Sequence, residues 1–231
     1  MNMNVLIPAV PRSELHETTI IKLMRVLVGS DINVRVFINF DVPPFLEEKN
    51  YSKTLNALQS IVGVDNVFFH VNDVDPCFTR AFLKVFDMSD KHGLKEGYYF
   101  WLEDDWELVD KESFLDKLKL LETCDTLCIV NGGPAGPPFI FNGKFFEMIR
   151  QVAGKFEISA FKLKEYDPEP FFQSVYTKFS KDIKNVRVGG RPDEKNSGSS
   201  ILLDRGRDWR EERKIRKWGS KTSGGRKTWG K

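Results

Sequence analysis

Three consecutive carboxylic acids, Glu103, Asp104 and Asp105, follow the apolar run YYFWL at residues 98–102. The aromatic and branched side chains of this run are typical of a strand that is covered on both faces. Three adjacent ionised groups at the end of such a strand repel one another, and partial burial strengthens the repulsion. We therefore expect a positive partner there, and a hard divalent cation held by carboxylate oxygens, Mg²⁺ or Mn²⁺, is the natural candidate.

The spacing of the triplet predicts how it would hold an ion. If the strand continues through it, Glu103 and Asp105 point to one face, about 6–7 Å apart, and Asp104 points to the other. A pair on one face can share a divalent ion directly or through water, and that ion can bridge two phosphate oxygens of a nucleotide diphosphate. The alternative is that the triplet is a solvated loop after the strand, with Trp106 as an anchor in the core.

A second acidic pair, Asp73 and Asp75, has the spacing Asp-x-Asp. Asp75 precedes Pro76 at a predicted helix start, where a carboxylate caps the helix and interacts favourably with its dipole. We interpret this pair as structural, with an accessory ribose contact and metal binding as the alternatives.

Strand and helix patterns alternate along the chain. Strands are predicted at residues 4–9, 34–40, 67–71, 98–102, 126–130 and 138–141. Helices are predicted from residue 13, at 51–62, 78–86 and 114–122, and from 144 to about 152. The first helix has Ser13 as its expected N-cap and an inward face of Leu15, Ile20, Leu23 and Leu27. The alternation indicates right-handed βαβ units and an α/β fold with a mostly parallel central sheet, whose ligands bind outside the carboxyl ends of the strands, where the triplet falls.

Composition limits the class of protein. The 231 residues are 41% hydrophobic and 29% charged, as in an ordinary soluble globular protein. No apolar run approaches the roughly 20 residues that span a bilayer, and the N-terminus lacks the basic region of a secretory signal. The cysteines, Cys77, Cys124 and Cys128, have no metal-ligand spacing, and we interpret them as reduced core residues of a cytoplasmic protein.

The β/α alternation followed by a hydrophobic strand and the triplet EDD resembles the GT-A nucleotide-sugar glycosyltransferases over residues 4–180. The resemblance implies a Rossmann-like three-layer α/β/α fold and transfer of a sugar, in particular from a UDP sugar, to a glycan or glycoprotein acceptor with help from Mn²⁺ or Mg²⁺. It implies that Asp105 is the direct metal ligand with Glu103 beside it, and that Glu103 and Asp104 serve the ribose or the metal waters. In size and tail character, the compact enzymes of large DNA viruses and phages are nearest, which would place the protein in a host cytoplasm.

Other residues fit the same resemblance. The segment VLIPAVPR is similar to the loop with which the family holds the nucleotide base, which implies nucleotide contacts from Pro8, Ala9, Val10 and Arg12. Asp41, at the end of the second strand, resembles the family's acid that contacts the base or ribose. Arg80 resembles a basic residue near the sugar nucleotide, and residues 132–146 resemble the acceptor-side loop, strand and helix.

An inverting enzyme of this kind needs a general base that deprotonates the acceptor hydroxyl. The segment KEYDPEPFF offers Glu165, Asp167 and Glu169. Asp167 precedes Pro168 and has the pattern of a helix cap, so Glu169 in the first turn is the favoured candidate and Asp167 the second. The alternative for Glu169 is the ordinary preference for acids at helix N-termini, and a retaining mechanism stays open.

Basic residues gather at the C-terminus. Residues 204–231 carry 11 Lys and Arg against 4 Asp and Glu, whereas the rest of the chain carries 24 and 29. We therefore divide the chain into a catalytic domain at residues 1–203 and a basic tail at 204–231, which follows a Gly- and Ser-rich loop at 189–200. Arginines of the tail, Arg207 among them, suit a cationic cover over a diphosphate. A solvated helix face and contact with nucleic acid are the alternatives.

The histidines do not predict a metal site. His16, His70 and His92 are scattered, and none lies near the C-terminus, where many members of the family carry a metal-binding histidine. Asp204 or a water molecule would have to take that position. Two other classes of function therefore stay open beside a glycosyltransferase: a metal-dependent phosphoryl or nucleotidyl transferase acting on nucleic acid, and a module that only binds.

Overall fold

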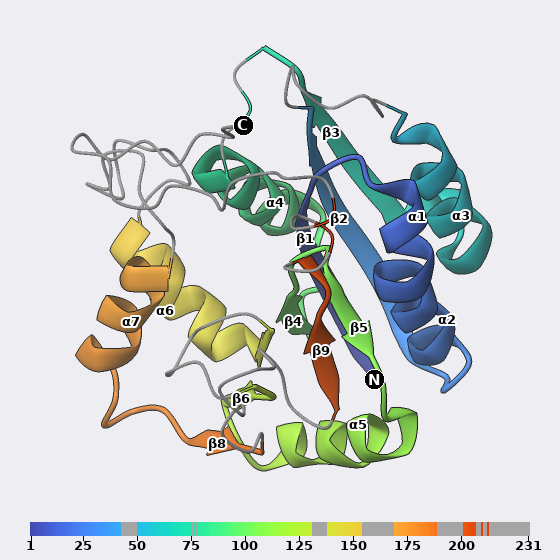
Figure 1. The fold of residues 1–231 in the computed structure, drawn as a ribbon. Coiled ribbons are helices and arrows are strands. Elements are labelled where there is room, and N and C mark those ends of the chain that lie inside the picture. Colours follow the sequence, from blue (N-terminus) through green and yellow to red (C-terminus); the bar gives the residue numbers. More distant parts are fainter. Residues whose placement is uncertain are drawn as a thin grey trace.

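The chain forms an α/β fold (Figure 1). The computed structural model describes residues 1–42, 50–74, 76, 78–130, 138–153, 169–188, 201–206, 209 and 212. The strands are β1 (Asn2–Ala9), β2 (Asn33–Asp41), β3 (Val67–Asn72), β4 (Tyr98–Trp101), β5 (Trp106–Leu108), β6 (Thr126–Cys128), β7 (Phe139–Phe141), β8 (Asn185–Arg187) and β9 (Leu202–Asp204). The α-helices are α1 (Ser13–His16), α2 (Lys22–Val28), α3 (Ser52–Val62), α4 (Phe78–His92), α5 (Lys111–Leu118), α6 (Gly143–Ala153) and α7 (Glu169–Lys178). A π-helical segment, η1 (Glu17–Ile21), joins α1 to α2, and η2 (Val64–Asn66) and η3 (Lys119–Glu122) are short 3-10 helices.

A seven-stranded sheet with the order β3-β2-β1-β4-β7-β6-β8 forms the centre of the fold. β1 pairs in parallel with β2 and β4, and β2 pairs in parallel with β3. β7 runs antiparallel to both of its neighbours, and β6 pairs in parallel with β8. The predicted α/β fold with a mostly parallel central sheet is confirmed.

Helices cover both faces of the sheet and divide the core in two. Alternate residues of β1 point to opposite faces, because the side chains of a strand alternate. Met3, Val5 and Ile7 pack in one cluster with α2, α3 and α5. Leu6 packs in the other cluster with α4, α6 and α7. Figure 1 shows the resulting three layers, with the sheet between the two groups of helices.

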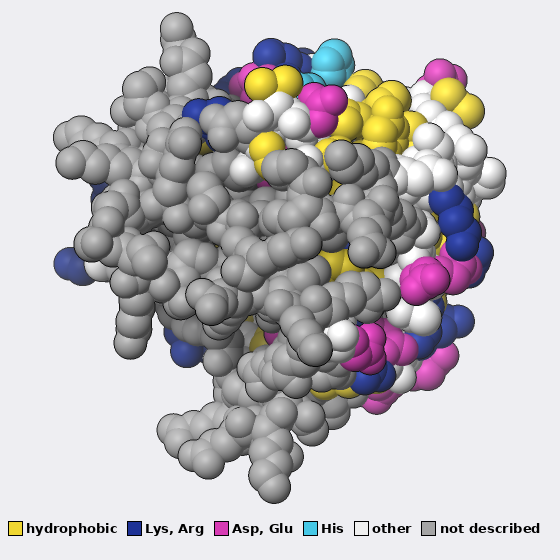
Figure 2. All heavy atoms as spheres, turned by 45° about the horizontal axis from the view of Figure 1, so that its top comes forward, with side chains coloured by type: hydrophobic (Ala, Val, Ile, Leu, Met, Phe, Trp, Pro, Cys, Tyr) yellow, Lys and Arg dark blue, Asp and Glu magenta, His cyan; other side chains and the backbone are white. Residues whose placement is uncertain are grey.

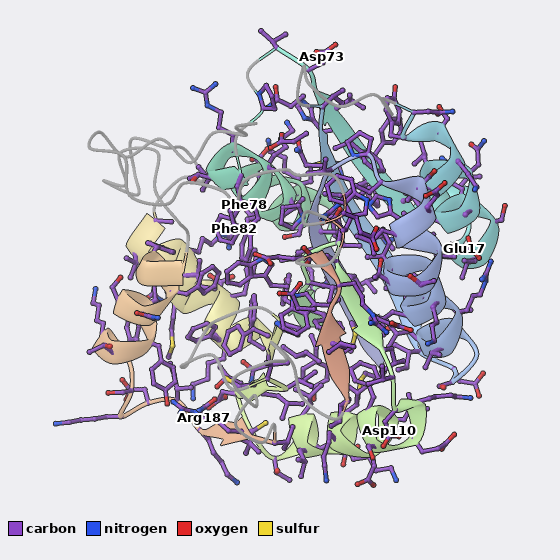
Figure 3. All side chains as sticks on the ribbon, viewed as in Figure 1. Glu17, Asp73, Phe78, Phe82, Asp110 and Arg187 are labelled. Atoms are coloured by element: carbon purple, nitrogen blue, oxygen red, sulfur yellow. The ribbon has the colours of Figure 1, made fainter. Side chains whose placement is uncertain are left out.

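Aromatic rings fill much of the second cluster and fix the end of β4. Phe82 of α4 lies edge-on to Trp101 of β4 and to Phe172 of α7, with centroid distances of 5.1 and 5.3 Å. Trp101 stacks on Phe172 at 4.8 Å. Figure 3 shows Phe82 on α4, on the side of α6 and α7. Each such ring pair contributes about 0.5–1.5 kcal/mol beyond its buried area, so Trp101, the last residue of β4, is firmly held just before the acidic triplet.

The triplet itself lies in a turn, which corrects the expected geometry. β4 ends at Trp101, and the chain turns at Asp104 and Asp105 before β5 pairs antiparallel with β9. The expected alternation, with Glu103 and Asp105 on one face of a strand and Asp104 on the other, is therefore wrong. The local sequence could not predict this turn, because the strand that follows it, β5, forms by pairing with β9, a segment close to the other end of the chain.

The first helix also differs from the expectation. Ser13 is the first helical residue and Arg12 occupies the N-cap position, so Ser13 is not the N-cap. The Arg12 side chain makes no capping hydrogen bond to the helix. Ile20, Leu23 and Leu27 are fully buried as expected. Leu15 is only partly buried, and His16 is buried in its place. The wider turn of the π-helical segment η1 changes which residues of the helical segment face the core.

Two of the three cysteines are buried in the core, as predicted. Cys124 and Cys128 are buried and reduced, whereas Cys77 lies outside the described residues. None of the helices in the described ranges is long and apolar enough to cross a membrane. Figure 2 shows acidic, basic and hydrophobic side chains interspersed on one face of the molecule.

Asp125, just before β6, anchors the far end of the sheet. Its carboxylate accepts hydrogen bonds from Asn142 Nδ2 at 2.9 Å, from the Lys184 backbone N–H at 2.8 Å and from Lys144 Nζ at 3.2 Å. Burial by itself raises the pKa of Asp125, but the hydrogen bonds from Lys184, Asn142 and Lys144 outweigh it and lower the pKa. A lowered folded-state pKa stabilises the fold above the unfolded value of about 3.9, and this stability is lost as the pH falls through the folded-state pKa.

We expect Asp125→Asn to lower the free energy of unfolding at pH 7 by about 1–3 kcal/mol. The difference from wild type should shrink as the pH falls below about 4, where the wild-type carboxylate becomes protonated. Urea unfolding at pH 7, 5 and 3 measures the loss of unfolding free energy and its dependence on pH. The control is Asp116→Asn, whose side chain is 61% exposed and should contribute little. A difference that stays constant from pH 7 to pH 3 would contradict the assignment.

Candidate active site

The strand order reverses between β1 and β4. The chain proceeds from β1 through β2 to β3 on one side of β1, whereas β4 lies on its other side. The segment after β1 and the turn after β4 therefore meet at the carboxyl ends of two neighbouring parallel strands. In open α/β sheets such a reversal opens a crevice in which ligands bind. The acidic triplet lies at this reversal of the strand order.

Asp104 connects the two segments. Its Oδ2 accepts hydrogen bonds from the backbone N–H of Val10 and from Nε of Arg12, each at 3.1 Å. Its Oδ1 accepts a further bond from Nη2 of Arg12, which makes the pair a two-pronged fork. Arg12 and Asp104 are each only 3% exposed. Arg12, at the end of β1, is thus a positive partner of the triplet.

One guanidinium is shared by three carboxylates. Arg12 Nη2 also lies 3.6 Å from Asp105 Oδ2. Burial alone lowers the pKa of Arg12, but the charges of Asp104, Asp105 and Glu103 outweigh it and raise the pKa. Burial alone raises the pKa of Asp104, but the Arg12 charge and the hydrogen bond from His16 hold that pKa well below its usual range. Arg12 and His16 thus both bind Asp104, and Arg12 also lies beside Asp105.

His16 is part of this cluster, which the sequence analysis missed. Its Nε2 lies 2.8 Å from Asp104 Oδ2 and its Nδ1 lies 2.9 Å from Thr54 Oγ1 of α3. The sequence could have indicated His16 through its position four residues after Arg12, because residues about one helical turn apart project to the same side of a helix. The backbone supports this, since the His16 N–H donates to the Arg12 carbonyl oxygen at 2.9 Å.

Glu107 of β5 is a second residue that the sequence analysis missed. Its Oε2 accepts a bond from Arg205 Nε at 2.6 Å, and its Oε1 accepts one from Lys22 Nζ at 3.1 Å. Burial alone raises the pKa of Glu107, but Arg205 and Lys22 outweigh it and lower the pKa. Glu107 therefore joins α2, β5 and the segment after β9.

The first residues of the basic tail lie at the site. The Arg205 N–H donates to the carbonyl oxygen of Asp105 at 2.8 Å. The ring of Trp209 lies over the Arg12 guanidinium, 4.9 Å from its carbon to the ring centroid. The boundary expected between residues 203 and 204 falls within β9, so the tail begins on a strand that pairs with β5. Arg207 lies outside the described residues.

Asp41 lies at the carboxyl end of β2 and is 1% exposed. Its Oδ1 accepts bonds from Asn39 Nδ2 at 3.1 Å and from Asn72 Nδ2 at 3.2 Å. The Asn39 Oδ1 lies 2.8 Å from His70 Nδ1 on β3. The two amides fix the carboxylate of Asp41 at the end of β2, the strand next to β1.

The other predicted residues are distributed as follows. Pro8 and Ala9 are buried at the end of β1, next to Val10. Arg80 is partly buried in the first turns of α4. Asp73 is exposed beyond the end of β3, at the top of Figure 3, and its partner Asp75 lies outside the described residues. Glu169 begins α7, but its side chain, like Glu165 and Asp167, lies outside the described part of the chain.

The donors around the turn fit a divalent cation that binds together with a ligand. Asp105 and Glu103 supply carboxylate oxygens, which Mg²⁺ and Mn²⁺ prefer. Within the described ranges no group of three or more His, Cys, Asp or Glu side chains is arranged to hold a metal by itself. Mg²⁺ is commonly held by one or two carboxylates together with substrate phosphates and water, so this donor set suits an ion that a diphosphate helps to bind.

Comparisons with known proteins give several solved structures of low sequence identity. No protein family model matches the chain. No curated protein matches it in sequence. A 4-diphosphocytidyl-2C-methyl-D-erythritol synthase from Anaerococcus prevotii is 13% identical, covering 80% of this chain and 86% of that one, with a TM-score of 0.49. A nucleoside-diphosphate-sugar pyrophosphorylase from Vibrio cholerae is 10% identical, covering 80% and 90%, with a TM-score of 0.46.

A third solved structure, described as a nucleotide-diphospho-sugar transferase from Desulfovibrio desulfuricans, is 11% identical. It covers 81% of this chain and 79% of its own, with a TM-score of 0.38. Because these three TM-scores lie below 0.5, the function proposed below rests only on the residues of this chain.

Proposed function

We propose that this chain is a metal-assisted glycosyltransferase that takes its sugar from a nucleotide diphosphate sugar, in particular a UDP sugar. The observation that supports it most is the convergence at one place of the strand-order reversal, an acidic turn and a buried arginine. Ligands of open α/β sheets bind at such a reversal. The turn carries carboxylate oxygens, which Mg²⁺ and Mn²⁺ prefer, and a bound cation would allow an acidic site to accept a diphosphate.

Asp105, with Glu103 beside it, would hold Mg²⁺ or Mn²⁺. The ion, when bound, would stabilise the negative charge of the departing diphosphate. Asp104 is engaged by Val10, Arg12 and His16, so its part is to join the two segments of the site. Asp41 accepts a hydrogen bond from the base or ribose, and the backbone of Pro8, Ala9 and Val10 lines the nucleotide.

The acceptor half of the site would lie at the start of α7. Phe172, three residues after Glu169, stacks on Trp101 and ties the first turn of α7 to the end of β4. This contact supports Glu169, in the first turn of α7, as the candidate base. In an inverting reaction Glu169 takes the proton of the acceptor hydroxyl as that oxygen attacks the anomeric carbon, and the diphosphate leaves with the bonding electrons.

The alternative is a nucleotidyl or phosphoryl transferase that acts on nucleic acid. The observation that favours it is the contact of Arg205 and Trp209 with the site, because basic and aromatic side chains together suit phosphates and stacked bases. The same acidic turn would serve this reaction.

Thermal unfolding with added ligands separates the two functions. UDP and UDP sugars should raise the unfolding temperature in the presence of Mn²⁺ and much less in its absence, because the ion carries the diphosphate. A single-stranded oligonucleotide should leave the temperature unchanged. Stabilisation by the oligonucleotide but not by UDP or its sugars would replace the glycosyltransferase with the alternative.

The contact between Trp209 and Arg12 predicts a role for the tail as a cover over the donor. We expect Trp209→Ala to weaken UDP-sugar binding roughly fivefold, which corresponds to a cation–π contact of about 1 kcal/mol. It should also raise the ratio of donor hydrolysis to transfer, since a cover excludes water. Titration calorimetry and a product assay measure the two effects.

The control for this prediction is Trp209→Phe, which keeps an aromatic ring over Arg12 and should stay close to wild type. Protease cleavage after residue 204 is a second measurement, and UDP with Mn²⁺ should slow it. Protection by an oligonucleotide and none by UDP would contradict the cover.

A further inference from the structure

His16 ties the acidic turn to the helical layer. It is fully buried and contacts Asp104 through Nε2 and Thr54, itself 2% exposed, through Nδ1. Because the carboxylate of Asp104 can only accept hydrogen bonds, His16 Nε2 carries a proton and donates. The Thr54 hydroxyl lies against Nδ1, and the contacts at both ring nitrogens fix the plane of the imidazole.

The same helical segment also holds the backbone of the turn. Thr19, three residues after His16, has its Oγ1 2.8 Å from the carbonyl oxygen of Asp104. Thr19 belongs to η1, and π-helical segments inside α-helices recur at functional sites. The side chain and the carbonyl group of Asp104 are thus both bound to the first turns of this helical segment.

Asp105 comes next in the chain, and its position follows from these contacts. Its own carbonyl oxygen accepts the bond from the Arg205 N–H. The carbonyl groups before and after its Cα are therefore both hydrogen-bonded. Displacement of Asp104 would move the Asp105 carboxylate with it.

We infer that His16 is a positioning residue for the Asp105 carboxylate. It sets where Asp105 can hold a cation, which in turn would bind a nucleotide diphosphate, and His16 itself touches neither. This inference rests on the function proposed above. Residues that orient a metal-binding group commonly change metal affinity or activity by about 10- to 100-fold when they are replaced.

Two amide replacements of His16 test the inference. The amide nitrogen of Gln reaches close to the position of Nε2, so His16→Gln keeps a donor to Asp104, whereas the shorter side chain of Asn ends near Nδ1 and loses it. We expect His16→Asn to weaken the binding of UDP in the presence of Mn²⁺ by about 10- to 100-fold. His16→Gln should retain most of the affinity. Titration calorimetry gives the dissociation constants, and circular dichroism shows that each variant is folded at the temperature used.

Thr54→Val keeps the test decisive if His16→Asn does not fold. It removes the hydroxyl at the far end of the chain of contacts with little change in shape, and it should weaken UDP binding in the same direction by less. The control is Thr18→Val, whose hydroxyl is exposed and bonds only the Leu15 carbonyl oxygen in the described part of the chain; it should bind UDP as wild type does.

The outcomes separate the inference from the function beneath it. Wild-type affinity in both His16→Asn and Thr54→Val, or equal losses in the Asn and Gln variants, would overturn the positioning role while leaving the proposed function intact. Failure of the wild-type chain to bind UDP with Mn²⁺ would overturn the proposed function, and the inference with it.

Discussion

Asp104→Asn is expected to lower the free energy of unfolding by about 3–5 kcal/mol, the usual result of removing one partner from a buried ion pair. Arg12 is 3% exposed and has its charge paired chiefly with Asp104. The neutral amide would leave that guanidinium buried beside a weaker partner at 3.6 Å, Asp105. It would also remove the charged acceptor of the hydrogen bond from His16. Chemical unfolding at pH 7 measures the loss.

The neighbouring acid supplies the control for this prediction. Asp105→Asn removes an equal charge one residue away, but the fork between Asp104 and Arg12 stays in place, so the apo protein should unfold at no lower temperature than wild type. Adjacent carboxylates should therefore behave differently, one affecting stability and the other ligand binding. Equal destabilisation by the two substitutions would contradict the assignment of Asp104 as the structural member of the triplet.

Glu169→Gln is expected to lower kcat by about 10²–10⁴-fold, the usual contribution of a general base. The amide cannot take up the proton of the acceptor hydroxyl, but it keeps the size of the side chain. Donor affinity should change little, because the proposed donor site lies at the carboxyl ends of β1 and β4 and does not include Glu169. Steady-state kinetics with a saturating donor, together with titration of UDP, gives the two quantities.

Glu147→Gln is the matched control for the proposed base. Glu147 lies on α6, is 56% exposed and pairs with Arg150, so its replacement should leave kcat unchanged. Equal losses in donor affinity and in kcat for Glu169→Gln would show that Glu169 only shapes the site. A full loss in an Asp167 variant with normal activity in Glu169→Gln would move the role to Asp167.

The parallel half of the fold could be predicted from the sequence because its signals are local. The runs at residues 4–9, 34–40 and 67–71 are rich in hydrophobic residues, which favours the strands of a parallel sheet, and they became β1, β2 and β3. β5 and β9 have three residues each, and their pairing depends on contacts between distant parts of the chain. No local pattern marks such a pair.

The site was predicted in outline and not in detail. The triplet was predicted at a strand's carboxyl end, and the structure brings Arg12, another predicted residue, into contact with Asp104 and Asp105. The carboxylates of the triplet cannot be told apart by residue type, and Asp104 acquires its role only through Arg12 and His16. His16 was missed because a buried histidine in a helix has no distinctive pattern of its own.

The most direct test of a metal-assisted nucleotide-sugar site is the titration of UDP into wild type and Asp105→Asn, each with and without Mn²⁺. The carboxylate of Asp105 holds the ion in this account, and the ion in turn holds the diphosphate. Wild type should bind UDP in a manner that depends on Mn²⁺, and Asp105→Asn should lose that dependence while it stays folded. Equal UDP affinity in the two proteins, or Mn²⁺-independent binding by wild type, would contradict the account.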